Sequence, residues 1–423
     1  MSTGNKLMEM MLRPVLGYGY EVANPSNTAF TTHERVHLAS ARQLLGTPIY
    51  TKGDAIRGEL GWWTMAGRMD KQRLLYLHRL QRMPSHHLAR KVFIHRMDDA
   101  RRRSAANQTK VIETRKGNRV RINPVRTYGY CHMINETLQR YKLDGHYATD
   151  ATTTKEKWKK LVISSIQRHQ EDEWRNNLAS KASTSPVAQW YQMVKSGTWG
   201  YPRWGFEEYL ADDQCDSPSA TSKDSSAVTI AGKRLRTLMR TYSAPLAACL
   251  AYVGRKVNID ASKACPFCNS QEIEETPSHL LVTCPTYHGP AYDRMMQLAE
   301  NEWYKARADQ SDWFLNYMAR ANRVDMNWTD RLAWHDMDEV HKAAWLLSFD
   351  ESDSLLAAVN EFLVVAFGCR KRLLLDAAKH AVGPKRKGKH KKKNKVDSNA
   401  DILLRAFRHI EANNDMDFTP LAS

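Results

Sequence analysis

Three cysteines and one histidine lie close together in the sequence at spacings typical of a metal site. Cys265 and Cys268 form a Cys-Pro-Phe-Cys motif, and His279 follows after ten intervening residues, with Cys284 after four more. The two-residue gap lets one tight turn direct both thiolates at a single point, and His279 and Cys284 fit one face of a helix or its end. Three thiolates and one imidazole suit tetrahedral zinc in a closed site. We therefore predict a structural Zn²⁺ that stabilises a module too small for a core of its own.

The remaining cysteines have no partner at metal-ligand spacing. His288 is an alternative ligand to His279, but the adjacent Gly289-Pro290 indicates a loop. Seven cysteines in 423 residues are too few for a disulfide scaffold, and an odd number argues against complete pairing. We expect a reducing, intracellular setting and ordinary buried or surface side chains at Cys131, Cys215, Cys249 and Cys369.

The distribution of charge favours a polyanionic partner. The formal net charge is +17, which attracts nucleic acid first and an anionic membrane second. Residues 68–126 hold seventeen Lys or Arg against four Asp or Glu, with Arg101, Arg102 and Arg103 at the centre. A run of mixed charge usually marks a solvated face, but one dominant sign over about sixty residues favours contact with a polyanion. A second run, 384–395, has eight Lys or Arg in twelve residues and predicts a disordered basic tail with a nuclear-import signal.

Apolar residues recur at helical spacing along most of the chain, which predicts a mainly α fold. Thr31-Thr32-His33-Glu34 has the spacing of a capping box at a helix start, and Gly46 before Pro48 is a stop signal. The first residues lack the charged and then apolar pattern of a secretory leader, so we expect none, and the most apolar stretch, 355–367, is too short to cross a bilayer. Helices are expected over 69–83, 154–182 and 232–253, and mostly helix after the cysteine motif up to residue 382. Expected core residues are Leu74, Leu77, Leu80, Trp158, Leu161, Val162, Ile166, Leu355, Leu356, Val359, Phe362, Leu363 and Ala366.

Short motifs flank the cysteines in an order that is more specific than the Cys-x-x-Cys pair alone. The order is Leu235-Arg236-Thr237, Pro245-Leu246, Cys265-Pro266-Phe267-Cys268, Glu275-Thr276, His279-Leu280-Leu281 and Cys284-Pro285. In this order the chain resembles the zinc-binding region that follows the polymerase domain in reverse transcriptases of non-LTR (LINE-type) retrotransposons. The N-terminal part resembles the thumb of the same enzymes at 12–19, 42–46, 59–62 and 73–77. Trp174, Trp190-Tyr191 and Lys195 fit the helical connection between them more loosely.

The resemblance covers about residues 7–300 and omits the catalytic part of the family. In these enzymes paired carboxylates hold two metal ions, one pair as Tyr-x-Asp-Asp on a hairpin of a palm that would precede Met1. Tyr209-Leu210-Ala211-Asp212-Asp213 has one residue too many and leads into a polar linker. The acidic residues after Cys284 form no endonuclease pattern either. We expect no catalytic residue and no enzymatic activity in this chain alone.

The resemblance implies a succession of segments that grip nucleic acid. The expected boundaries are a thumb-like helical domain (1–100), a basic linker (101–150), a helical connector (151–215), a linker (216–230), a zinc-binding module (231–300), a C-terminal helical region (301–382) and a basic tail (383–423). Template RNA, primer duplex or target DNA would be bound next to a separate palm, without a membrane. Candidate contacts are Arg73, Arg79, Arg82, Arg101, Arg102, Arg103, Arg234 and Arg236. The alternative is a domesticated, non-enzymatic RNA-binding subunit of a ribonucleoprotein particle.

Overall fold

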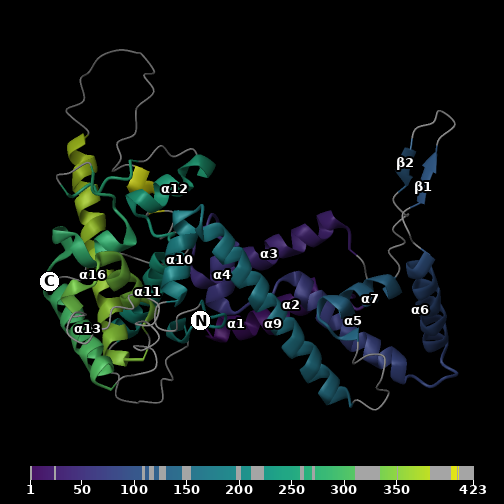
Figure 1. Cartoon of the computed structure of the whole chain (residues 1–423). Helices are drawn as coiled ribbons and strands as arrows, with labels where there is room; N and C mark the ends of the chain where they lie inside the picture. Colours follow the sequence, from purple (N-terminus) through teal and green to yellow (C-terminus); the bar gives the residue numbers. More distant parts are fainter. Residues whose placement is uncertain are drawn as a thin grey trace, which may run out of the picture. The chain divides into compact units, whose positions relative to one another are not determined.

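The chain is mainly helical, as predicted (Figure 1). The computed structural model describes residues 2–22, 25–106, 110–113, 119–122, 130–144, 154–196, 202–210, 223–257, 262–268, 272–309, 334–349, 351–381, 402–406 and 408. The chain is divided into two compact units. The smaller unit comprises Leu7–His37 and Trp63–Glu173, and the larger unit comprises Met1–Lys6, Leu38–Trp62 and Trp174–Ser423. Each unit therefore combines segments that are distant in sequence, unlike the consecutive segments that the sequence predicts.

The described residues of the first half of the chain form helices of varied length and one hairpin. The helices are α1 (Ser2–Leu7), a π-helical turn (Met8–Leu12), α2 (Arg13–Leu16), α3 (Asn27–Leu45), α4 (Gly53–Leu60), α5 (Met65–Arg82), α6 (Leu88–Ala106), α7 (Tyr130–Arg140), α9 (Lys155–Ala182) and α10 (Pro186–Ser196). The strands are β1 (Lys110–Glu113) and β2 (Arg119–Ile122), antiparallel, with Lys110 opposite Ile122.

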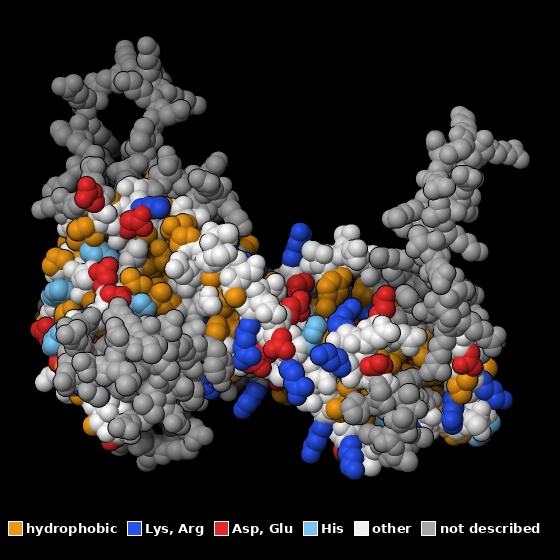
Figure 2. Space-filling view, viewed as in Figure 1, with side chains coloured by type: hydrophobic (Ala, Val, Ile, Leu, Met, Phe, Trp, Pro, Cys, Tyr) orange, Lys and Arg blue, Asp and Glu red, His pale blue; other side chains and the backbone are white. Residues whose placement is uncertain are grey.

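The core of the smaller unit forms where α5, α6, α7 and α9 meet. Leu74 and Leu77 are fully buried as predicted, and Trp158 of α9 donates its indole N–H to the Leu74 carbonyl at 2.9 Å. The expected helix over 69–83 begins four residues earlier, because the Thr64 hydroxyl caps it by accepting the Gly67 N–H at 3.1 Å. On the face drawn in Figure 2, Lys and Arg side chains gather over the part of the chain that contains α5, α6 and α9.

Two local predictions in this part of the sequence are wrong. Thr31 and Glu34 are not a capping box, since α3 already begins at Asn27 and the Thr31 hydroxyl donates to the Asn27 carbonyl at 2.7 Å. The Glu34 carboxylate instead accepts the Met65 N–H at 2.8 Å, at the first turn of α5. The region 101–150 is not only a linker, because it includes the end of α6, the hairpin and α7, whose Ile134 is fully buried in the core.

The larger unit is organised around α16. Its helices after α10 are α11 (Lys223–Arg240), α12 (Ala247–Val257), α13 (Pro290–Ala308), α15 (Glu339–Ser348) and α16 (Asp353–Ala381). Short 3₁₀ turns cover Glu208–Leu210, Pro285–Tyr287 and Trp334–Asp336, and a π-helical turn covers His279–Thr283. Helix α16 packs against α11 and α13 (Figure 1), and its Leu355, Val359 and Phe362 are buried as predicted.

Two breaks in the larger unit differ from the sequence prediction. The expected helix over 232–253 is two helices, α11 and α12, because Tyr242 adopts a left-handed conformation with φ of 54° between them. The expected linker 216–230 overlaps α11, which begins at Lys223, while 211–222 lies outside the described residues. The stop signal at Gly46 is confirmed, since φ is +66° there and α3 ends at Leu45. Among the described helices, no single one is long and apolar enough to cross a membrane.

Candidate metal centre and the interior around it

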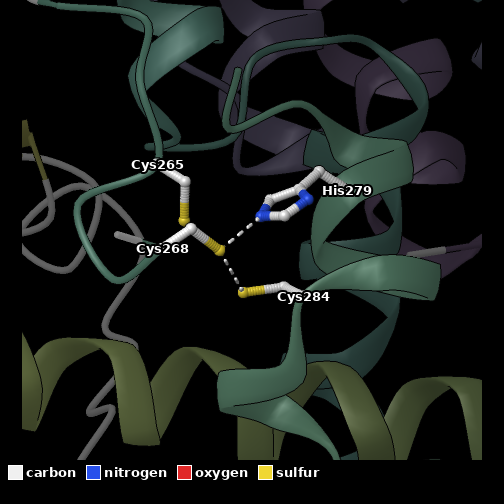
Figure 3. A group of neighbouring side chains, drawn as sticks. All are labelled: Cys265, Cys268, His279 and Cys284. Atoms are coloured by element: carbon white, nitrogen blue, oxygen red, sulfur yellow. Dashed lines mark hydrogen bonds between the residues drawn. The ribbon is translucent and has the colours of Figure 1, made fainter. Parts of the chain in front are cut away.

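The four predicted ligands come from two short segments of the larger unit (Figure 3). Cys265 and Cys268 lie in a turn that is held at its base by an antiparallel bridge between Ala264 and Glu274. His279 begins the π-helical turn His279–Thr283, and Cys284 ends that turn, with its N–H donating to the His279 carbonyl at 2.8 Å. The spacing therefore places the ligands as the sequence predicts, with one pair on a turn and the other pair across one helical turn.

The ligand atoms of the four side chains converge. All lie within 4.8 Å of one another, and Cys268 Sγ is 3.3 Å from His279 Nε2 and 3.9 Å from Cys284 Sγ. Around a tetrahedral zinc with usual bond lengths, two sulfurs would lie about 3.8 Å apart, and a sulfur and a nitrogen about 3.5 Å apart. The group could thus hold a metal ion, and its geometry and donor types are compatible with zinc.

The thiols have protonation preferences that a metal ion would change. A hydrogen bond with Cys284 and burial raise the pKa of the Cys265 thiol to about 12, and burial raises that of Cys268. The same pair interaction lowers the pKa of Cys284. A bound cation would stabilise all three as thiolates, which is how metal binding releases protons from such sites. His279 Nδ1 lies 3.0 Å from the Thr283 hydroxyl, which orients the ring with Nε2 towards the sulfurs.

The alternative ligand His288 does not belong to this group. Its exposed imidazole stacks on the Tyr292 ring with the centroids 4.1 Å apart. Of the other cysteines, Cys131 and Cys249 are buried and Cys369 is half-buried, as expected for ordinary side chains. Cys215 lies outside the described residues.

A buried ion pair joins the segment between the two pairs of candidate ligands to α16. Arg370 and Glu275 have no exposed side-chain surface, and Arg370 Nη2 donates to Glu275 Oε2 at 2.8 Å and to the Pro245 carbonyl at 3.0 Å. The same Glu275 oxygen accepts the Ala247 N–H at 2.7 Å, at the start of α12. The Arg370 guanidinium also lies 5.6 Å from the centroid of the Phe267 ring, inside the Cys-Pro-Phe-Cys motif. Glu275, which lies in the sequence between the two ligand pairs, therefore anchors both α12 and α16.

The structure places the expected nucleic-acid contacts in three different settings. Arg236 is fully buried and donates to the Leu347 and Phe349 carbonyls at 3.0 and 2.7 Å. Arg73 is 4% exposed and lies 3.6 Å from the Asp70 carboxylate. These two predictions need correction, because both side chains are committed to the interior. Arg79 and Arg82 are exposed on α5, and Arg234 is half-buried on α11.

The remaining predicted basic residues lie wholly or partly outside the described structure. The backbone at Arg101, Arg102 and Arg103 is part of α6, but their side chains lie outside the described part of the structure. The basic run 384–395 lies outside the described residues altogether, as do Asp212 and Asp213.

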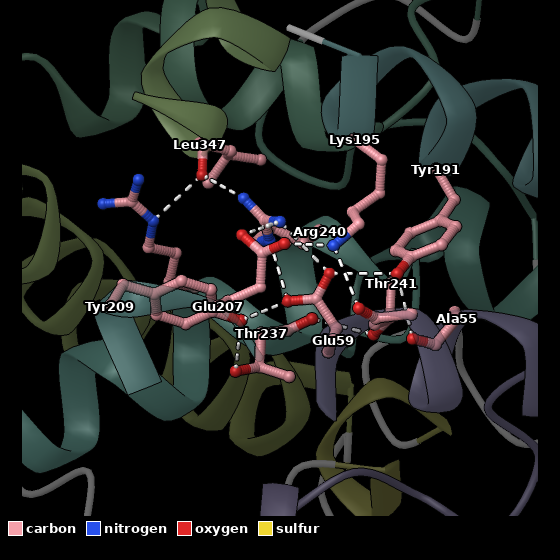
Figure 4. A network of polar contacts seen from close by, with 12 residues as sticks. Ala55, Glu59, Tyr191, Lys195, Glu207, Tyr209, Thr237, Arg240, Thr241 and Leu347 are labelled. Atoms are coloured by element: carbon pink, nitrogen blue, oxygen red, sulfur yellow. Dashed lines mark hydrogen bonds and ion pairs between the residues drawn. The ribbon is translucent and has the colours of Figure 1, made fainter. Parts of the chain in front are cut away.

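A second buried polar network lies in the larger unit and was not predicted (Figure 4). Arg240 donates to both oxygens of Glu59 at 3.0 and 3.1 Å and to Glu207 at 2.8 Å. Lys195 pairs with Glu207 and donates to the Gly58 carbonyl at 3.0 Å. Two cations thus balance two carboxylates. Burial alone would raise the pKa of Glu207, but Arg240 and Lys195 more than offset it and hold that pKa below its usual value.

Two tyrosines complete this network. Tyr191 donates to Glu59 Oε1 at 3.1 Å, and Tyr209 donates to Glu59 Oε2 at 2.6 Å. Tyr209 begins the sequence that superficially resembles Tyr-x-Asp-Asp, and here it is 1% exposed. Its hydroxyl is therefore used to satisfy a buried carboxylate. The only sequence signal for the network is the presence of Glu59, Tyr191 and Lys195 among the blocks of the resemblance.

Comparisons with protein-family models, with curated proteins and with solved structures gave no match to the chain. Its function has to be inferred from its own residues and their geometry.

Proposed function

We propose that this chain is a zinc-dependent, non-catalytic nucleic-acid-binding protein. In this proposal it supplies the thumb, connector and zinc-binding parts of a non-LTR retrotransposon reverse transcriptase, which hold RNA or DNA for chemistry performed on a separate palm. The observation that carries the proposal is the convergence of Cys265, Cys268, His279 and Cys284, the same four residues that anchor the sequence resemblance. The net charge of +17 supports a polyanionic partner.

The smaller unit offers the cations that such binding needs. Helices α5, α6 and α9 carry exposed Lys and Arg side chains, and the start of α9 also presents the positive end of a helix dipole. Cations and helix N-termini bind phosphates without reading the base sequence, so this surface would position a nucleic acid and not select one. The exposed cations on these helices are Arg79, Arg82, Lys91, Arg96, Lys155, Lys157, Lys159, Lys160 and Arg168.

We expect the affinity for a nucleic-acid hairpin to fall linearly with salt on logarithmic axes. Each phosphate contact releases condensed counterions and contributes about 0.7–0.9 to the slope. Six contacts would weaken binding by roughly three orders of magnitude between 50 and 200 mM salt. Replacing Arg79 and Arg82 together by Gln should flatten the slope by about 1.4–1.8, because two contacts are lost. Fluorescence anisotropy of a labelled hairpin at four salt concentrations measures the slope of log affinity against log salt.

The matched control is Arg294→Gln, which removes an exposed cation of the larger unit that pairs with Glu361 at 3.0 Å. It should leave the slope as in the parent protein. A parent slope near zero would refute the proposed function, because a polyanion-binding surface cannot be insensitive to salt. An Arg79/Arg82 double variant that behaves like the parent would remove α5 from the binding surface.

We also expect no templated nucleotide incorporation by this chain alone. Nucleotidyl transfer requires paired carboxylates that hold two metal ions, and the resemblance does not extend to the segment that supplies them. Primer extension on an RNA template, with Mg²⁺ or Mn²⁺, should give no product. Incorporation that survives Asp212→Asn together with Asp213→Asn would reveal an active site elsewhere in the chain. Incorporation that is abolished by this double change would show that the Asp pair is catalytic.

A further inference from the structure

Four cationic side chains of the smaller unit lie on α5 and on two helices that contact it, α2 and α9. Arg68 and Lys71 are three residues apart and share one face of α5. Arg13 lies on α2 and Lys159 on α9. The end of α2 packs closely on this part of α5, since a Cβ added at Gly17 would lie 3.1 Å from Gln72 Nε2. We call Arg13, Arg68, Lys71 and Lys159 the cationic cluster.

The positive charges of these groups influence one another. Burial lowers the pKa of Lys71, and the charges of Arg68, Lys159 and Arg13 lower it further. Burial also lowers the pKa of Arg68, and Arg13 adds to the effect. Like charges in partly desolvated positions repel one another more strongly than in water. The cluster is therefore an environment in which an added negative charge would be stabilised.

The carboxylates nearby do not balance the cluster. Among the described residues whose charges act on Arg13, Arg68 or Lys71, the acidic ones are Glu9 and Glu34. Glu9 pairs with Arg13 one helical turn away. Glu34 accepts the Met65 N–H at 2.8 Å, so part of its acceptor capacity is used at the start of α5. Arg13, Arg68 and Lys71 thus face these two carboxylates, and Lys159 adds a further positive charge that acts on Lys71.

The hydrogen-bonding state of Arg68 points to a missing acceptor. Its Nε is buried and has no hydrogen-bond partner among the described residues. A buried guanidinium N–H without an acceptor is costly, and native structures usually satisfy such groups. Beside it, Lys71 is only partly exposed, with its ammonium 5.8 Å from the centroid of the Trp63 ring. The Trp63 indole N–H is already donated to Gln167 Oε1 at 2.5 Å, so the ring is fixed as one wall of the cluster.

We propose that the cationic cluster is a phosphate-binding site, and that its ligand is a backbone phosphate of the nucleic acid. A backbone phosphate carries one negative charge shared between two strong acceptor oxygens, and inorganic phosphate carries between one and two at neutral pH; both suit guanidinium and ammonium donors from three helices. The identity of the ligand rests on the proposed function, whereas the chemistry of the site does not. The cluster would fix the register of the nucleic acid on the smaller unit, while the exposed cations of α5, α6 and α9 other than Lys159 add affinity.

The first arm of the test uses inorganic phosphate and the zinc-loaded full chain. Phosphate should raise the melting temperature of the parent relative to chloride at equal ionic strength. Lys71→Gln with Lys159→Gln should abolish this rise. The matched control, Lys157→Gln with Lys160→Gln, removes the same charge from other faces of α9 and should keep it. Arg68→Lys retains the charge but loses the forked donor geometry, and it should reduce the rise without abolishing it.

The second arm measures hairpin affinity against salt for the same proteins. The Lys71/Lys159 variant should lose one or two phosphate contacts. Its slope of log affinity against log salt should therefore be flatter than that of the parent by about 0.7–1.8. If the parent binds the hairpin but the variant keeps the parent's slope and phosphate response, the cluster is not a phosphate site, and the proposed function stands. If phosphate stabilises the parent through the cluster but no hairpin binds, the proposed function fails and the ligand is a small phosphate compound.

Discussion

Replacing Cys284 by Ser is expected to abolish stoichiometric zinc binding and to unfold the segment around the four ligands. The parent should contain one zinc per chain by mass spectrometry of the metal, and the variant close to none. Metal binding contributes on the order of 10 kcal/mol to folding in zinc-finger peptides, so the loss should exceed any other single change in this segment. In hydrogen exchange, the Cys265 and Glu275 amides, which donate to the Ile273 and Lys263 carbonyls at 2.8 and 2.9 Å, should lose their protection.

Cys369→Ser is the matched control, because Cys369 is a half-buried thiol of α16 outside the ligand group. It should keep one zinc per chain and normal exchange. Protection in the smaller unit, such as that of the α5 amides, should be the same in both variants, since it contains no ligand. A Cys284→Ser protein that retains one tightly bound zinc would contradict the Cys₃His site.

The second large effect is expected from Arg240→Met in the larger unit. The substitution would leave Glu59, which is fully buried, and Glu207 with Lys195 as the remaining cation. Removing one partner from a buried ion pair typically lowers the free energy of unfolding by about 3–5 kcal/mol, because an uncompensated charge stays in the interior. Urea denaturation, followed by a probe in the larger unit, would measure the change.

Arg294→Met provides the same change of side chain at an exposed ion pair with Glu361. Such pairs contribute roughly 0–1 kcal/mol, so the control should unfold almost like the parent. A further variant, Arg240→Met with Glu59→Gln, removes one carboxylate charge and should recover part of the loss. Equal stability of Arg240→Met and Arg294→Met would show that the network is not a determinant of folding.

The convergence of the four candidate ligands could be predicted because the information is local. The Cys-x-x-Cys pair needs only a turn, and His279 and Cys284 need only one helical turn between them. The core positions of α5, α9 and α16 were equally accessible, since an apolar stripe repeats within each helix. For the same reason the mainly α class follows from periodicity alone.

Which arginine side chains are buried in the interior could not be predicted in this way. A charged residue in a basic stretch is normally exposed, and nothing in the sequence around Arg236 indicates that its donors reach carbonyls 111 and 113 residues away. Arg240 and Glu59, which are 181 residues apart, pose the same problem. The capping box failed for a related reason, because Glu34 is used by the distant Met65 N–H and not by its own helix start.

Several residues that made the sequence resemble a family turn out to be interior polar groups. Glu59, Tyr191 and Lys195 belong to one buried network, and Glu275 anchors Arg370 in another. Such residues have few tolerated replacements, because each satisfies a desolvated partner. This explains why short blocks can carry a resemblance without containing the residues that would contact a ligand.

The Glu275–Arg370 pair also has a consequence for the order of events on the ribosome. Its partners are 95 positions apart, and all four metal ligands are translated before α16 begins. At the usual 5–20 residues per second, a ribosome needs roughly 5–20 s to travel from one partner to the other. The set of four ligands is complete once Cys284 has been translated, nine residues after Glu275, and stays complete for the rest of that interval. If the proposed zinc is captured in that period, it would fix the surface on which Arg370 docks. The supply of metal during translation would then decide whether that surface is ready when α16 emerges.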